Sequence, residues 1–152
     1  MDEFVEKLNE RINQWNKITH KGSEMLEQLC IQDHHSFDKS KTTAKDEQIF
    51  IEDGAKIELS CLIKELCSQL DHMYTDYNKM IKQLEQQEQE IEVLKRIVLC
   101  LSMFEQEYKL KKTINESLHS GSPPTVEQIS TVVLTVWKTQ PYVNEKLIKE
   151  IV

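Results

Sequence analysis

The residue types best suited to metal chemistry gather at Asp33, His34, His35 and Asp38. Zinc sites on helices place their ligands at i and i+4, and a flexible loop loses entropy when a site orders it. This segment is polar and aperiodic, so a solvated loop is the better interpretation. The four cysteines, Cys30, Cys61, Cys67 and Cys100, show no paired zinc-ligand spacing. No metal or other cofactor is predicted.

Catalytic and nucleotide-binding patterns are also missing from the sequence. The three glycines stand alone at positions 22, 54 and 121, and nothing resembles the phosphate-binding GxxxxGK loop. Evenly scattered Glu and Lys form no recognisable arrangement of nucleophile and base. The chain is therefore predicted not to be an enzyme.

The charge balance narrows the range of partners. Charged residues make up 30% of the 152 residues, and the net charge of −7 opposes binding to nucleic acid or to anionic membranes. The basic run Lys109, Lys111 and Lys112 is interpreted as a solvated helix face. No signal peptide and no apolar run of about 20 residues is present, so we expect a soluble intracellular protein with reduced thiols.

One modification site is suggested by Ser122, which precedes Pro123 in a predicted loop. A phosphate there would lie near the N-terminus of the next helix, where negative charge is favourable. Ser-Pro is also ordinary turn chemistry, so both interpretations stay open.

The chain that positions these residues contains only 3 Gly and 3 Pro. This composition favours helices over turn-rich sheet folds. Residues 1–32 are predicted to form an amphipathic helix with apolar or small residues spaced three and four apart. The row comprises Val5, Leu8, Ile12, Trp15, Thr19, Gly22, Leu26 and Leu29. Gly22 in this row indicates a close approach of a neighbouring segment or a bend.

Residues 33–54 are predicted to be a polar linker, because the apolar periodicity disappears there. Within it, residues 49–52 (IFIE) suit a short extended piece, and Asp53 with Gly54 suits a turn or helix cap.

Residues 55–119 contain neither proline nor glycine and are predicted to form one long helix with a coiled-coil seam. The seam comprises Ile63, Leu66, Leu70, Met73, Tyr77, Met80, Leu84, Gln87, Ile91, Leu94, Val98 and Leu101. One helix would extend about 95 Å, against a diameter of about 40 Å for a compact chain of this length. Either the helix breaks near the polar segment QLEQQEQEIE, or another polypeptide covers the seam.

Residues 120–152 form a C-terminal region of short helices. Thr125 and Gln128 suit a capping box, Pro141 should end a helix at Gln140, and Asn144 should cap a last helix. A single apolar face is expected to carry Val126, Ile129, Val132, Val133, Val136 and Trp137. Trp137 and Tyr142 are predicted to pack across the Gln140–Pro141 corner, with partner contact as the alternative.

The predicted fold is thus all-α, an elongated helical bundle or coiled coil with one long central helix and short C-terminal helices. The candidate partner-binding or junction residues are Trp15, Leu70, Tyr77, Leu84, Ile91, Leu94, Trp137, Gln140, Pro141, Tyr142 and Val143.

The ending LKKTINESLHSGSPPTVEQISTVVLTVWKTQPYV resembles the C-terminal signature of the cyclin-dependent kinase 2-interacting protein family. There a Leu-Lys-basic-Thr helix leads through a polar loop to W-x-x-Q-P-Y-V, which Trp137, Gln140, Pro141, Tyr142 and Val143 match. Trp15 and Gly22 repeat the family's W-x6-G spacing. The likeness covers residues 5–30 and 107–143, and the chain lacks the family's Pro-containing interruption before the C-terminal helices.

The resemblance implies a nuclear adaptor, with the cytoplasm as a second location, that links cell-cycle kinases to DNA replication and checkpoint signalling. It also implies a subunit that acts beside a helical partner on a hexameric AAA ATPase, in replisome proteostasis and in large ribosomal subunit maturation. The alternative is a homodimeric coiled-coil scaffold without kinase or ATPase partners.

Overall fold

The computed structural model describes residues 1–34, 42–84 and 88–152, and side chains within 1–30, 54–84 and 90–152. Three long helices come first: α1 (Asp2–His34), α2 (Thr42–Gln83) and α3 (Glu88–Leu118). Four short elements follow: α4 (Val126–Gln128), the π-helical turn η1 (Ile129–Val133), α5 (Leu134–Thr139) and α6 (Glu145–Ile151). No strand occurs in the described residues, and the all-α prediction is confirmed.

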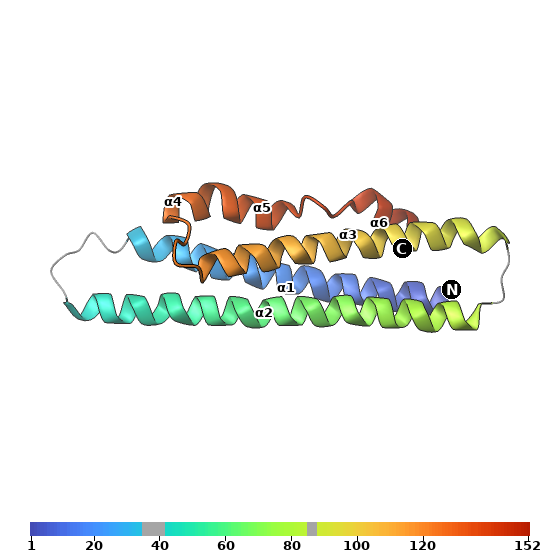
Figure 1. The fold of residues 1–152 in the computed structure, drawn as a ribbon, viewed down its shortest axis with the longest axis horizontal. Helices are drawn as coiled ribbons and strands as arrows, with labels where there is room; N and C mark the ends of the chain where they lie inside the picture. Colours follow the sequence, from blue (N-terminus) through green and yellow to red (C-terminus); the bar gives the residue numbers. More distant parts are fainter. Residues whose placement is uncertain (35–41, 85–87) are drawn as a thin grey trace.

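The three long helices run up, down and up to form an elongated bundle (Figure 1). The C-terminal region, residues 120–152, lies along this bundle and is called the arm below. Its α4, η1 and α5 pack on α1, and its α6 packs on α3. Both termini lie toward the end of the bundle where α2 ends and α3 begins (Figure 1).

The prediction of one helix over residues 55–119 is not confirmed. Helix α2 ends at Gln83, α3 begins at Glu88, and the two helices lie side by side in opposite directions (Figure 1). Residues 85–87, including the seam position Gln87, lie outside the described residues. The change of direction falls between Gln83 and Glu88, in the polar QLEQQEQEIE segment, which is the first of the two alternatives that the sequence left open.

The predicted linker over residues 33–54 is shorter than expected. Helix α1 continues to His34 and α2 begins at Thr42, so residues 49–52 are helical rather than extended and Gly54 lies inside α2. Residues 35–41 lie outside the described part of the chain. No proline precedes Pro123, and one interior Gly costs only about 1 kcal/mol in a helix, so nothing stops α2 here.

The α2 part of the predicted seam is covered by the chain itself. Leu66 and Met73 are fully buried, and Ile63, Leu70 and Met80 are nearly so. They form one core with the predicted face of α1, where Leu8, Ile12 and Leu26 are buried. The fold-back of α3 and the packing of α1 therefore give α2 the cover that was otherwise expected from another polypeptide.

Local signals in the arm are largely confirmed. Thr125 and Gln128 form the capping box, α5 ends before Gln140, and the Asn144 side chain accepts hydrogen bonds from two backbone N–H groups of α6. The predicted single apolar face is only partly right: Ile129 and Trp137 are buried, but Val132 is 58% exposed. Val132 lies within the π turn η1, whose smaller rotation per residue than an α-helix turns it away from the face that Ile129 buries.

Leu66→Ala should lower the free energy of unfolding by about 2–5 kcal/mol, because it leaves a cavity in a fully covered core. Ile57→Ala, on an α2 residue that is 64% exposed, should change it by less than about 0.5 kcal/mol. Urea unfolding followed by circular dichroism measures both. Equal effects of the two substitutions would contradict burial of the α2 seam by the chain itself.

Candidate functional site

The arm meets the bundle where the N–H edge of the Trp137 indole ring, on α5, packs against Gly22 of α1. The Trp137 side chain is fully buried, and its indole N–H donates a hydrogen bond of 2.8 Å to the backbone carbonyl of Thr19. A Cβ atom at position 22 would overlap the indole ring, coming within 2.8 Å of its Cε2 atom. Gly22 is thus required by a side chain of the arm that packs directly on the α1 backbone.

A second tryptophan makes the reciprocal contact. Trp15 of α1 is fully buried, stacks edge-on against Phe104 of α3, and donates its indole N–H to the Gln140 side-chain oxygen at 2.8 Å. The Thr19 hydroxyl donates to the same oxygen at 3.4 Å. An indole N–H can only donate, so the acceptor end of the Gln140 amide must face it.

The Gln140–Pro141 pair shapes the backbone at this corner. Gln140 has a left-handed backbone, with φ 45°, and is the only non-glycine residue in the described part of the chain with positive φ. Pro141 has no N–H, so the Trp137 carbonyl, four residues earlier, has no helical donor. Lys111 of α3 supplies one: its ammonium group donates to that carbonyl at 3.2 Å.

Lys111 is a fully buried cation paired with a fully buried carboxylate. Its Nζ atom donates to Glu107 at 2.8 Å and lies 4.7 Å from the centroid of the Trp137 ring. The other Glu107 oxygen accepts the backbone N–H of Tyr142 at 3.1 Å. Burial lowers the pKa of Lys111, and the hydrogen bond and charge of Glu107 oppose that shift.

These contacts define one structural unit, called the lock below. Its members are Trp15, Thr19 and Gly22 from α1, Glu107 and Lys111 from α3, and Trp137, Gln140 and Tyr142 from the arm. The indole N–H groups of Trp15 and Trp137, the Lys111 ammonium group and the Glu107 carboxylate each bond to another group of the chain. The chemistry of the lock is positional, because it fixes where the arm lies on α1 and α3.

The outer part of the corner remains accessible. Pro141 is exposed, Tyr142 is 49% exposed and Val143 is half-buried. The prediction that Tyr142 packs across the corner is therefore wrong for its side chain, although its backbone N–H belongs to the lock. Ser122 is exposed in the turn between α3 and α4, where its hydroxyl is open to solvent.

The remaining candidate residues fall into a covered and an uncovered group. Leu70 is buried, and Tyr77 and Leu84 are half-buried against the core of the bundle. Ile91 and Val98 are 50% and 47% exposed on α3, where Leu94 between them is half-buried and Leu99 beside them is 59% exposed. These four α3 residues are called the α3 stripe.

Lys111 and Glu107 are the lock members that sequence reasoning missed. Lys109 and Lys112 are solvated as expected, with side chains 70% and 53% exposed, but Lys111 was wrongly assigned to the same face. A signal was present, because Lys111 stands seven residues after Phe104 and seven before Leu118, both buried. A charged residue on an apolar helix face, with Glu107 one turn earlier, indicates a buried pair.

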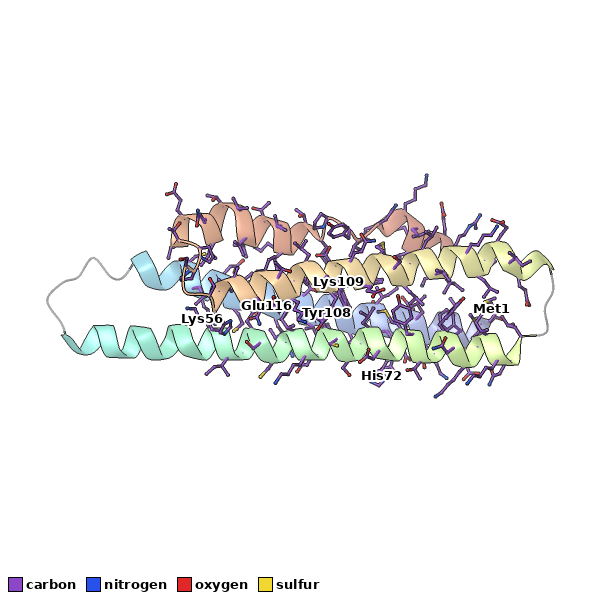
Figure 2. All side chains as sticks on the ribbon, in the orientation of Figure 1. Met1, Lys56, His72, Tyr108, Lys109 and Glu116 are labelled. Carbon is purple, nitrogen blue, oxygen red and sulfur yellow. The ribbon has the colours of Figure 1, made fainter. Side chains whose placement is uncertain are left out.

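Outside the lock, the described residues form a packed interior and open surface grooves. Side chains from the three long helices fill the space between them, as Figure 2 shows around Tyr108. An open groove of about 700 Å³ on α1 and α2 is lined by polar residues such as Lys17, His20 and Glu65. No group of three or more potential metal ligands occurs in the described ranges; His34 ends α1, and His35 and Asp38 lie outside them.

No helix in the described residues is long and apolar enough to cross a membrane. Comparison of the chain with models of known protein families, with curated proteins and with solved structures finds no match.

Gly22→Ala should lower the free energy of unfolding by about 1–3 kcal/mol, because the added methyl group displaces Trp137. Gly54→Ala is the matched control: nothing lies within 4 Å of a Cβ there, so the better helix propensity of Ala should stabilise the chain by about 0.5–1 kcal/mol. Urea unfolding followed by tryptophan fluorescence compares the two. Stabilisation by both substitutions would contradict the contact between Gly22 and Trp137.

Cys100 should resist alkylation in the native protein at pH 8. The residue is fully buried, and burial raises the pKa of its thiol to about 11, so very little thiolate is present. The exposed Cys61 should react first with iodoacetamide, and Cys100 only after unfolding in urea. Mass spectrometry of the alkylated peptides measures both rates, and equal native rates would contradict burial of Cys100.

Proposed function

We propose that the chain is a non-enzymatic adaptor subunit whose α3 stripe binds a helix of another protein. The observation that carries this proposal is the exposure of Ile91, Val98 and Leu99 close together on one helix. Ile91, Leu94 and Val98 keep the three and four spacing of a coiled-coil seam, which an amphipathic partner helix matches. Covering them removes apolar surface that the chain's own helices leave in water.

The composition of α3 supports the same proposal. Between Ile91 and Phe104 it carries apolar residues all around its circumference, a pattern typical of helices buried on every side. The bundle and the arm cover Ile97, Cys100, Leu101 and Phe104, while Val98 and Leu99 stay exposed. A partner on the outer face would complete this burial.

The family resemblance supplies the identity of the proposed partners. The lock contains Trp15, Gly22, Lys111, Trp137 and Gln140, which are among the positions that carry the resemblance. A chain that keeps these residues keeps the contact between arm and bundle, so the motif argues for a common fold. By this resemblance we propose a nuclear subunit beside a helical partner on a hexameric AAA ATPase. Its proposed roles are replisome proteostasis, large ribosomal subunit maturation, and the linking of cell-cycle kinases to replication and checkpoint signalling.

The α3 stripe also suits a second copy of the chain, which would make the protein a homodimeric scaffold. Light scattering after size exclusion separates the two functions. The adaptor proposal expects the purified chain to be a monomer that forms a hetero-oligomer with a helical partner. A stable homodimer disrupted by Val98→Glu would instead favour the scaffold.

Val98→Glu combined with Leu99→Glu should abolish capture of a helical partner and its ATPase from cell extract, because two charges would be buried in an apolar contact. The tagged full-length chain and quantitative mass spectrometry measure this loss. Ile57→Glu is the matched control, since it places the same charge on an exposed apolar residue of α2. Unchanged capture by the double variant, with its circular dichroism intact, would contradict binding through the α3 stripe.

A further inference from the structure

The arm depends on the bundle far more than the bundle depends on the arm. Among the buried apolar side chains of the described residues, Ile129 and Trp137 alone come from the arm. Helix α6 has no buried residue, and Val132, Tyr142 and Val152 are 58%, 49% and 45% exposed. The three long helices supply the other buried apolar side chains, and seven partly buried residues of the arm, among them Leu134 and Ile148, pack against them. The larger share of the hydrophobic free energy of folding therefore belongs to the long helices.

The arm is attached mainly at one place. Its side-chain and backbone hydrogen bonds to the bundle come from Trp137, Gln140, Tyr142 and Asn144, all within eight residues, and from the ion pair of Lys138 with Glu27. The segment before α4 makes only local hydrogen bonds among the described contacts, such as Ser120 to the Ser117 carbonyl. If the lock opens, the arm therefore loses its hydrogen bonds to the bundle all at once rather than one after another.

The helices of the arm are too short and irregular to stay folded when the arm is not packed on α1 and α3. Its helical stretch from Val126 to Thr139 is interrupted by the π turn η1, and α6 has only seven residues. Isolated helices of this length are marginal in water. Release from α1 and α3 should thus coincide with loss of the arm's helical hydrogen bonds.

Because of the buried ion pair, the free energy needed to release the arm from α1 and α3 is smaller than the number of lock contacts alone would suggest. Lys111 and Glu107 are both fully buried under the arm, and taking two charges out of water offsets much of their mutual attraction. When the arm leaves, both charges become hydrated again. The left-handed backbone of Gln140 also relaxes. The lock therefore gives the arm a unique position, while the cost of burying the ion pair offsets part of the stabilisation from its other contacts.

We propose that the arm is a latch, which opens as one cooperative unit while the three-helix bundle stays folded and exposes the face formed by Trp15, Gly22 and Lys111. This opening is a local unfolding step, distinct from global unfolding. This opening requires no partner on the α3 stripe.

Native-state hydrogen exchange of the full-length chain, read by mass spectrometry over a range of urea concentrations below the transition, tests the latch. Amides of α5 and α6 should exchange on the order of a hundredfold or more faster than those in the middle of α2, with a weaker dependence on urea. Equal rates and equal urea dependence in the arm and α2 would overturn the proposal. Complete absence of protection in the arm would also overturn it, because a closed latch protects its amides.

Trp137→Ala provides a second test. It should abolish protection in the arm, while α2 keeps its protection and the chain keeps a cooperative urea transition. Val132→Ala, on an exposed residue of the same segment, is the matched control and should leave the arm protected. Loss of the urea transition in Trp137→Ala would show that the bundle cannot stand without the arm, and would overturn the proposal.

Discussion

The contact of Trp137 with the backbone of α1 at Gly22 determines the arrangement of the rest of the arm. It brings the indole N–H to the Thr19 carbonyl and places the Gln140 amide on Trp15. It also sets the distance at which Lys111 reaches the Trp137 carbonyl. With any larger residue at position 22, these hydrogen bonds could not all form at once, because the helices would be too far apart.

Pro141 connects this packing to the electrostatics of the junction. By removing the donor that a helix would offer to the Trp137 carbonyl, it leaves an acceptor that must find a partner inside the protein. The buried Lys111 is that partner, and Glu107 neutralises it while accepting the Tyr142 N–H. A proline of the arm and a lysine and glutamate one turn apart on α3 are thus parts of one hydrogen-bonded arrangement.

Local signals predicted the helical class and most of the ends of the short helices. The capping residues Thr125 and Asn144 and the stop at Pro141 act through neighbouring backbone groups, so sequence alone suffices to find them. The reversal between α2 and α3 depends on which surfaces cover each other, and the apolar spacing of Leu84, Ile91 and Leu94 continues across it unchanged. The spacing therefore left open whether the helix breaks or another polypeptide covers the seam, and in the structure Ile91 and Val98 of α3 are the seam residues left about half exposed. The charge of Lys111 suggests a solvated residue, whereas its spacing from the buried Phe104 and Leu118 indicates its true place on the buried face of α3.

The π turn η1 has a consequence for how related chains should be compared. A π turn accommodates one residue more than a regular α-helix over the same rise, and here it brings Ile129 and Trp137 to the same buried side although they are eight positions apart. A chain one residue shorter between positions 129 and 133 would present the same two side chains from an uninterrupted α-helix. If an alignment of two such chains allows no one-residue gap at this point, the equivalent tryptophans fall one position out of register, and related chains can be scored as unrelated.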